Sequence, residues 1–130
     1  MPSEAARPLL SIVVPAYNEA RRLPYSLDQI VTFVESQDYD AEVIVVNNNS
    51  SDETPQIAQA FADRYPYIRM LHEPRQGKGV AVRTGMLAGR GEHLFICDAD
   101  LSMPIEEINK FLPPALDGYD VAIASREVEG

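Results

Sequence analysis

The sequence predicts an α/β protein in which a mostly parallel sheet is covered by helices on both faces. Short, nearly all-apolar runs alternate along the chain with segments whose apolar residues recur at helical spacing. Strands that lack a polar face are typical of a parallel sheet buried on both sides. In such open sheets, ligands bind beyond the carboxyl ends of the strands, where the strand order reverses. We therefore look for chemistry in the loops that follow strands.

The first three elements are a strand, a helix and a strand. We expect a strand at residues 9–14, which Pro15 would stop. Residues 24–37 are predicted to form a helix, because Pro24 suits a first turn and apolar residues recur at helical spacing. The β-branched run at residues 41–46 predicts the second strand.

The alternation continues to the end of the chain. A helix is expected at residues 54–65, where Pro55 suits the first turn and residues 50–54 offer capping side chains. The remaining expected elements are strands at 68–71, 93–97 and 121–124, and helices at 80–88 and 104–116. Residues 1–8 are interpreted as a flexible lead-in, and residues 9–130 as about one domain.

The composition limits the classes of partner. A formal net charge of −9 argues against nucleic acid, whose phosphate backbone binds to basic patches. The single cysteine, Cys97, lies in an apolar run and is expected in the core; it allows no internal disulfide, so nothing indicates secretion. The chain contains no apolar run of about 18 residues, and residues 1–8 lack the apolar core of a signal peptide. We therefore expect a cytoplasmic protein.

Two carboxylates follow the strand predicted at residues 93–97. In an extended chain alternate side chains point the same way, so Asp98 and Asp100 would share one side. Carboxylates this close repel unless a cation lies between them, and a hard divalent cation takes oxygen ligands. A second Asp-x-Asp, at Asp38 and Asp40, is interpreted as a polar turn, because it lies at the opposite edge of the predicted sheet.

Two further loops follow strands at the same edge as Asp98. Tyr17 offers a ring on which a base can stack, and Glu19 can accept from ribose hydroxyls; the alternative is a packed ring and a helix-start carboxylate. Asn47 directly follows the second strand, and its amide offers the donor and acceptor that suit a base edge. Residues 50–52 are interpreted as a turn and helix cap.

A third loop, Arg-Gln-Gly-Lys-Gly at residues 75–79, combines glycines with a cation. Glycine allows close backbone approach, Lys78 is positive, and the N-terminus of the following helix favours anions. The alternative is a flexible surface loop, since the segment matches neither the P-loop nor the Rossmann fingerprint. His72 and His93 are interpreted as strand-end residues and not as metal ligands.

Together these segments resemble family 2 glycosyltransferases of the GT-A fold. The resemblance covers about residues 9–126 and is carried by four segments in matching order: SIVVPAYNE at 11–19, VIVVNNNSSDET at 43–54, GKG at 77–79 and CDAD at 97–100. Within the family, the chain looks most like dolichyl-phosphate glucosyltransferases and their prokaryotic polyprenyl-phosphate relatives. The resemblance implies a Rossmann-like GT-A sheet, of which this chain holds the N-terminal, donor-binding part.

The resemblance implies an inverting transfer of a hexose, glucose or mannose, from a nucleotide diphosphate sugar to polyprenyl or dolichyl phosphate. UDP-glucose is the donor that we expect. The base and ribose of the donor would lie against residues of the first two loops, namely Pro15, Ala16, Tyr17, Glu19 and Asn47.

The resemblance also implies which residues bind the sugar and the diphosphate of the donor. Asp98 and Ala99 would contact the ribose or sugar, and Asp100 would bind Mg²⁺ or Mn²⁺ across the diphosphate. Asp98 and Asp100 would thus be the catalytic pair. Lys78 and Arg83 would add positive charge near the donor.

Two departures from the family pattern matter. The family usually has Asp where this chain has Asn47, which leaves the preferred base open. The family's catalytic domain is longer, so the acceptor-binding half and a catalytic base are expected beyond Gly130. A lipid acceptor would bring the protein to the cytoplasmic face of a membrane, with contact through segments absent here. The alternatives are a non-catalytic nucleotide-sugar-binding fragment and a sugar-phosphate nucleotidyltransferase of related fold.

Overall fold

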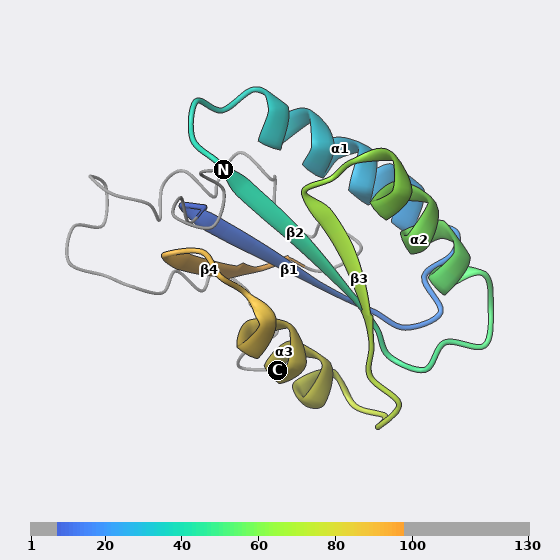
Figure 1. Cartoon of the computed structure of the whole chain (residues 1–130). Coiled ribbons are helices and arrows are strands. Elements are labelled where there is room, and N and C mark those ends of the chain that lie inside the picture. Colours follow the sequence, from blue (N-terminus) through green and yellow to red (C-terminus); the bar gives the residue numbers. More distant parts are fainter. Residues whose placement is uncertain (1–7, 98–130) are drawn as a thin grey trace.

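The computed structural model describes residues 8–97, which form a four-stranded sheet with helices on both faces (Figure 1). The elements in chain order are β1 (Leu10–Ala16), α1 (Leu23–Glu35), β2 (Ala41–Asn47), α2 (Thr54–Arg64), β3 (Ile68–His72), α3 (Lys78–Ala88) and β4 (His93–Ile96). Every pair of neighbouring strands is parallel. The predicted fold class is thereby confirmed. The helix expected at 104–116 and the strand expected at 121–124 lie outside the described residues.

The strand order is β3-β2-β1-β4, so the order reverses at β1. The chain steps outward from β1 to β2 and β3, and α3 then carries it back to β4 on the other side of β1. Ligands in open parallel sheets bind at such a reversal, beyond the carboxyl ends of the strands. The expected location of a site is therefore the end of β1 and its neighbours.

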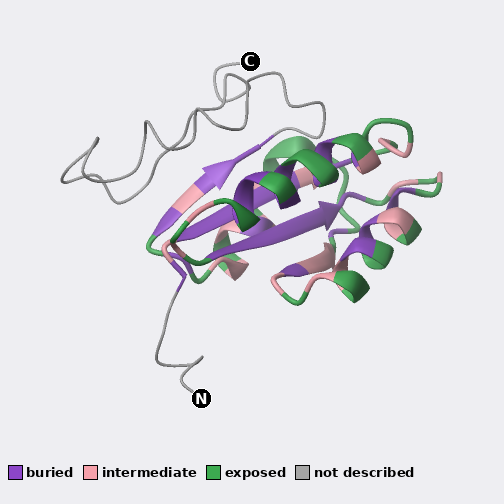
Figure 2. Cartoon of the chain, turned by 90° about the horizontal axis from the view of Figure 1, so that it is seen from above, coloured by how far each residue is buried: buried purple, intermediate pink, exposed green. Residues whose placement is uncertain are grey.

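Helices α1 and α2 cover one face of the sheet, and α3 covers the other (Figure 1). The larger cluster joins the first face to α1 and α2 through residues such as Ile12, Leu27 and Phe61. Figure 2 shows the strands almost wholly buried and the outward faces of the helices exposed. Each fully buried leucine or isoleucine contributes about 1.5–3 kcal/mol, so this face supplies most of the stabilisation within the described residues.

Helix α3 packs against the second face through small residues. Ala81 and Gly85 are its buried positions, and they lie over Val13 and Val46. A Cβ atom added at Gly85 would overlap the Val13 side chain and lie 3.1 Å from Val46 Cγ2. The missing side chain lets α3 approach the sheet closely, which sets the position of its N-terminus at the carboxyl edge.

Element ends differ from prediction in two places that matter. The first strand was expected to stop before Pro15, but β1 continues through Pro15 to Ala16. The Val13 carbonyl accepts from Cys97 N–H, so the backbone of Val13 faces β4. Two residues further on, the backbone nitrogen of Pro15 faces the same side, but at a position beyond Ile96, the last residue of β4. Proline is tolerated there because no described ladder bond needs its missing N–H. Helix α3 begins at Lys78, two residues before the expected start.

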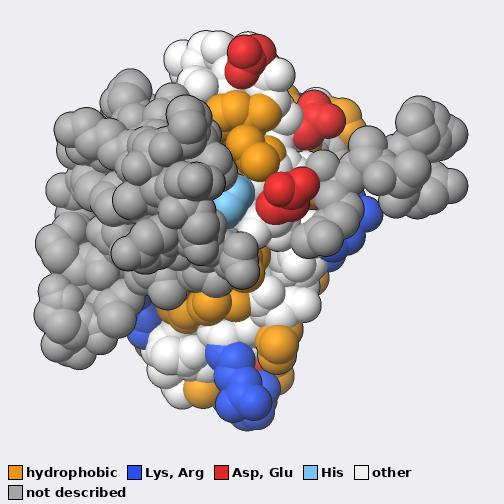
Figure 3. Space-filling view, turned by 90° about the vertical axis from the view of Figure 1, so that its left-hand side faces the viewer, with side chains coloured by type: hydrophobic (Ala, Val, Ile, Leu, Met, Phe, Trp, Pro, Cys, Tyr) orange, Lys and Arg blue, Asp and Glu red, His pale blue; other side chains and the backbone are white. Residues whose placement is uncertain are grey.

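The amino edge of the sheet is held by a buried carboxylate on β2. Glu42 accepts hydrogen bonds from Ser11 Oγ and from the Arg90 N–H, both at 2.6 Å. Ser11 Oγ in turn accepts from Gly91 N–H at 2.7 Å. This network ties the connection between α3 and β4 to the two central strands. Figure 3 shows acidic, basic and apolar side chains together on one face of the molecule, so no single sign of charge covers the described surface in that view.

Candidate functional site

The carboxyl ends of β1, β2 and β3 form one row across the sheet. Ala16 pairs with Asn47, and Asn47 pairs with His72. The pairing continues one residue further, because Asn48 N–H donates to the Ala16 carbonyl at 2.8 Å and Glu73 N–H donates to the Asn47 carbonyl at 2.9 Å. The loops that follow these three strands therefore start side by side.

The Asn47 side chain is buried, with 4% of its surface exposed. By strand alternation it lies on the face of the sheet that α1 and α2 cover. Its Nδ2 lies 3.0 Å from His72 Nδ1, and its Oδ1 accepts from Ser50 N–H at 3.3 Å. The amide nitrogen can only donate, so the His72 ring accepts through Nδ1. The sequence pattern did not predict that Asn47 would be engaged by a histidine on the next strand.

The loop after β1 is fastened to the loop after β2. Asn18 adopts φ 52°, and its N–H donates to Ser50 Oγ while its Oδ1 accepts from Ser51 N–H at 2.8 Å. Left-handed backbone is less costly for Asn than for most residues. Glu19 N–H donates to Thr54 Oγ1 at 2.8 Å. These contacts before α1 and α2 thus connect two loops that are more than thirty residues apart in sequence.

Asp52 links the start of α2 to the loop after β1. Its Oδ1 accepts from the N–H and the hydroxyl of Thr54, and its Oδ2 accepts from Ala20 N–H. Partial burial acts to raise the pKa of Asp52, but the hydrogen bonds from Thr54 and Ala20 outweigh it and lower the pKa below its ordinary value. The N-cap position itself, Glu53, makes no side-chain cap bond; among the side chains of residues 50–54, only that of Asp52 accepts from an N–H of the first turn of α2, that of Thr54.

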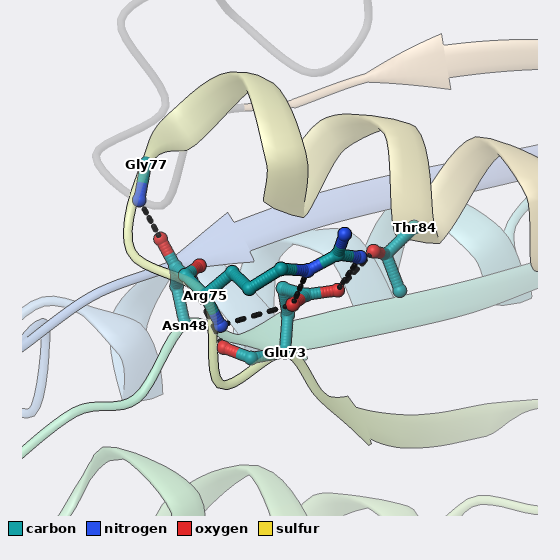
Figure 4. Close-up of polar contacts among 5 residues, drawn as sticks. All are labelled: Asn48, Glu73, Arg75, Gly77 and Thr84. Atoms are coloured by element: carbon teal, nitrogen blue, oxygen red, sulfur yellow. Dashed lines mark hydrogen bonds and ion pairs between the residues drawn. The ribbon is translucent and has the colours of Figure 1, made fainter.

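The loop after β3 is fastened to the end of β2 and to α3 (Figure 4). Asn48 is buried, and its carboxamide bonds the backbone of this loop at Glu73, Arg75 and Gly77. The Glu73 carboxylate accepts from Arg75 through the backbone N–H and the guanidinium, and from the Thr84 hydroxyl at 2.5 Å. The loop is thus held from the sheet side by Asn48 and from the helix side by Thr84.

Glu73 has the most strongly lowered carboxyl pKa among those resolved for the described residues. Hydrogen bonds from Arg75 and Thr84 lower the pKa of Glu73 from 4.5 to about 2. The same contact raises the pKa of the Arg75 guanidinium. Glu73 is therefore ionised at every pH at which the protein would work, and it cannot serve there as a proton donor.

The predicted residues of the first loop lie at the end of β1. Pro15 and Ala16 belong to the strand, and Ala16 is buried. Tyr17 follows with half of its surface exposed, which leaves its ring accessible. The Glu19 carbonyl accepts from the N–H groups of Arg22 and Leu23 in the turn that leads into α1, but Glu19 lies before the first turn of the helix, so its carboxylate is not the helix-start group of the alternative interpretation.

The two predicted cations occupy different positions on α3. Lys78 is its first residue and is exposed, directly after Gly77, whose N–H bonds Asn48. The fold therefore brings Lys78 to the same edge as Asn47 and Tyr17. Arg83 is also exposed but lies more than a turn further along the helix, between the buried positions Ala81 and Gly85. The described contacts do not bring Arg83 to this edge.

A hollow of about 820 Å³ lies beside the first loop, at the start of α1. Its lining includes Glu19 and Asp52, together with residues of α1 and the segment before it: Asn18, Arg21, Arg22, Tyr25, Ser26 and Gln29. Glu19 is the one predicted donor residue that lines it within the described part of the chain. This hollow therefore borders the loop edge but does not lie in front of Asn47.

The predicted catalytic and metal residues Asp98 and Asp100, and the predicted substrate-binding residue Ala99, lie outside the described residues. They follow directly after Cys97, which is buried as expected and donates its N–H to the Val13 carbonyl at 2.8 Å. Within residues 8–97, no group of three or more His, Cys, Asp or Glu side chains could hold a metal ion. Asp38 and Asp40 are exposed in a turn before β2, and His72 and His93 end and begin strands, as predicted.

The sequence did not predict a role for the residues that connect the loops. Asn18, Asn48 and Glu73 contact partners 11 to 33 residues away, and periodicity carries no information on such pairs. One signal was available for Asn48 and Glu73. Each polar residue comes one or two positions after an apolar strand, where a side chain must find a partner if it is buried.

The comparisons with known proteins agree with this geometry. The sequence profile of Glycosyl transferase family 2 matches residues 11–130, which is nearly the whole chain. The chain therefore belongs to glycosyl transferase family 2. The described part also has the Rossmann-like parallel sheet of GT-A glycosyltransferases, which confirms the resemblance found in the sequence.

One similar curated protein is the dolichyl-phosphate beta-glucosyltransferase ALG5C of Trichomonas vaginalis. It is 40% identical over 106 residues, which cover 77% of this chain and 32% of that protein. The chain spans about a third of the length of this relative. Similar proteins also include a dolichol-phosphate mannosyltransferase of Pyrococcus furiosus, 32% identical over 93% of this chain and 34% of that protein.

Among solved structures, the chain is similar to the mannosyltransferase PcManGT from Pyrobaculum calidifontis, which was determined in complex with GDP-Man and Mn²⁺. The two share 34% identity and a TM-score of 0.65, over 78% of this chain and 30% of that one. Within residues 8–97, none of the helices is both long and apolar enough to cross a membrane.

Proposed function

We propose that this chain is the donor-binding part of an inverting hexosyltransferase that uses UDP-glucose and a polyprenyl or dolichyl phosphate. The observation that carries the proposal is the hydrogen-bonded set of three loops at the carboxyl edge of the sheet, beside the reversal of strand order. The similar dolichyl-phosphate glucosyltransferases and mannosyltransferases support the class of acceptor and sugar.

The first two loops would take the nucleoside. The half-exposed Tyr17 ring offers a stacking surface for the base, and Glu19 would accept from ribose hydroxyls. Pro15 and Ala16 would form the floor beneath them at the end of β1. The Asn47 carboxamide, after its bonds to His72 and Ser50, retains one N–H and one lone pair. A uracil edge offers an acceptor and a donor to match them, and a guanine edge does so too, so Asn47 alone does not select the base. The choice of glucose as the sugar is supported by the similar dolichyl-phosphate beta-glucosyltransferase.

The charged groups would take the diphosphate and the sugar. The exposed Lys78 ammonium, at the first turn of α3, adds to the partial positive charge of the helix N-terminus. Arg83 would add positive charge further along α3. Asp98 and Ala99 would lie against the ribose or sugar. Asp98 and Asp100 offer carboxylate oxygens, which fit Mg²⁺ or Mn²⁺, and Asp100 would hold the ion.

When bound, such an ion would offset negative charge on the diphosphate leaving group. The chain's own residues would orient the donor: the nucleoside by Tyr17, Glu19 and Asn47, and the diphosphate by Lys78. A lipid phosphate acceptor is already anionic at neutral pH, so its oxygen needs little help from a general base. Such an acceptor would keep the enzyme at the cytoplasmic face of a membrane.

Donor titration tests the metal and nucleotide parts of this proposal. UDP-glucose and GDP-mannose are titrated into the protein with and without Mn²⁺, followed by calorimetry. We expect UDP-glucose to bind more tightly with Mn²⁺, and Asp100→Ala to lose at least tenfold in affinity in its presence. Asp40→Ala makes the same change in the other Asp-x-Asp and should bind like the wild type.

Equal binding by Asp100→Ala and the wild type would remove the metal role of Asp100. Tighter binding of GDP-mannose would reverse the donor assignment. The competing nucleotidyltransferase function is checked by supplying UTP and glucose 1-phosphate and measuring pyrophosphate release, which we expect to be absent. Turnover with polyprenyl phosphate, measured for this chain and for a C-terminally extended version, separates an active enzyme from a fragment that only binds the donor.

A further inference from the structure

The Asn48 carboxamide makes three hydrogen bonds to one loop. Its Nδ2 donates to the Glu73 carbonyl at 3.0 Å and to the Arg75 carbonyl at 2.6 Å, and its Oδ1 accepts from Gly77 N–H at 3.0 Å (Figure 4). Asn48 is 4% exposed, so water contributes little to these contacts. We call this set of contacts the Asn48 clamp.

The clamp requires a carboxamide. Two carbonyl oxygens of the loop need donors, and one N–H needs an acceptor, which matches the donors and acceptor of asparagine. An aspartate of the same shape can only accept when ionised. It would turn a negative oxygen toward the Glu73 and Arg75 carbonyls, which is repulsive and is costly in a buried position.

Other contacts hold the same loop in the same place. Gln76 Nε2 donates to the carbonyls of Asn48 and Asn49, at 3.2 and 3.3 Å. The Glu73 carboxylate, buried between Arg75 and Thr84, connects the start of the loop to the second turn of α3. The loop from Glu73 to Gly77 is therefore fixed against both β2 and α3, and Asn48 is the residue that touches its beginning, middle and end.

We propose that Asn48 is a positioning residue for donor binding. By holding the loop from Glu73 to Gly77 against the end of β2, the clamp fixes the first turn of α3 and so places Lys78 at the same edge of the sheet as Asn47. The clamp acts through the loop backbone and needs no contact between Asn48 and the donor. This inference rests on the proposed function, because it assigns the purpose of the clamp to nucleotide-sugar binding.

The test compares two asparagine-to-aspartate variants one residue apart. Asn48→Asp removes both donors of the clamp. Asn49→Asp makes the same change of charge at an exposed side chain that makes no hydrogen bond among the described residues, with φ 59°, which aspartate also tolerates. The measurement is the Kd for UDP-glucose with Mn²⁺ at pH 7, with GDP-mannose as a second donor. We expect at least a tenfold weaker Kd for Asn48→Asp and a change within about twofold for Asn49→Asp.

The pH profile separates positioning from a general loss of stability. As pH falls from 7 to 5, the introduced carboxyl at position 48 gains a proton and can donate again. The Kd of Asn48→Asp divided by the Kd of Asn49→Asp should therefore fall toward one. The protection of the amides of residues 75–78 against hydrogen exchange, measured without donor and relative to the wild type at the same pH, should be lower in Asn48→Asp at pH 7 and should recover at the lower pH. If Asn48→Asp does not fold, Asn48→Ala replaces it, with an expected loss of about three- to tenfold and no narrowing with pH.

The outcomes distinguish the two proposals. If the wild type binds the donor and the folded Asn48→Asp and Asn49→Asp variants have nearly equal Kd values, the role of the clamp is overturned and the proposed function stays in place. The role of the clamp would also be overturned if the Kd of Asn48→Asp divided by that of Asn49→Asp stays constant with pH. Failure of the wild type to bind either donor would overturn the proposed function, and the positioning role with it.

Discussion

Gly77 is the residue at which the loop after β3 turns into α3. Its φ of 132° lies in a region that side chains rarely adopt, and a Cβ atom there would meet only Val80 Cγ2, at an ordinary 3.9 Å. A substitution would therefore cost backbone energy without a steric clash. The bond from Gly77 N–H to Asn48 requires this backbone path.

We expect Gly77→Ala to lower the free energy of unfolding by about 1–3 kcal/mol, because alanine must adopt the same strained backbone or break the bond to Asn48. Gly79→Ala is the matched control: it lies two residues on, inside α3, with open space around the added methyl group. Its effect should be neutral or stabilising by up to ~1 kcal/mol. Urea unfolding of both variants measures the difference, and equal stabilities would contradict the backbone argument.

The Glu73 carboxylate gives a prediction on acid stability. Its pKa of about 2 in the folded protein lies below its value of 4.5 in the absence of the Arg75 and Thr84 contacts. The unfolded chain thus binds the proton more readily, so the stabilisation from these contacts is complete above about pH 4.5 and is lost as the pH falls toward 2. Glu73→Gln removes this titration.

We expect the stability of Glu73→Gln to fall less steeply between pH 4.5 and 2 than that of the wild type. Glu53→Gln, at an exposed side chain directly before α2, is the control and should keep the wild-type dependence. Urea unfolding at several pH values gives the comparison. Parallel curves for the wild type and Glu73→Gln would show that the ion pair with Arg75 does not contribute to acid sensitivity.

At the scale of elements, the close approach of α3 to the sheet depends on Gly85. A methyl group at this position would overlap Val13, which lies in the centre of β1. We expect Gly85→Ala to destabilise by about 1–2 kcal/mol, because overpacking of ~1–3 kcal/mol outweighs the gain in helix propensity of ~1 kcal/mol. Thermal unfolding against Gly79→Ala, which gains propensity without a clash, provides the measurement. A stabilised Gly85→Ala would show that α3 is loosely seated.

The sequence predicted the helices and strands better than it predicted the residues at which they begin and end. Short, nearly all-apolar runs predicted every described strand, because the sheet is buried on both faces, and apolar residues at helical spacing predicted the helices, which are buried on one face. The end of β1 was wrong, since proline is excluded from a strand only where its N–H would be needed, and the neighbouring strand decides that. The early start of α3 at Lys78 was also missed, because glycine and lysine there carry no apolar signal.

At the scale of the molecule, the topology of an α/β sheet predicted the edge at which the loops meet, and the structure brings the first three loops together there. It could not predict which side chains those loops use on one another. Asn47 was expected to face a ligand, which stays a prediction; the bond that it makes to His72 was not foreseen, and it forms because both residues end paired strands on the same face. Such a contact follows from the strand register, which the sequence of either strand alone does not contain.

The strand order β3-β2-β1-β4 has a consequence for how the chain acquires its structure during synthesis. Strands β1 and β2 each pair with the next strand along the chain, so β1, β2 and β3 can assemble as soon as residue 72 is available. Leu10 must wait for His93 before its second neighbour is present. Contacts between residues so far apart in sequence form slowly. A nascent chain on the ribosome would therefore expose one open side of β1 until β4 emerges, and within the described sheet β4 would be the last strand to be added.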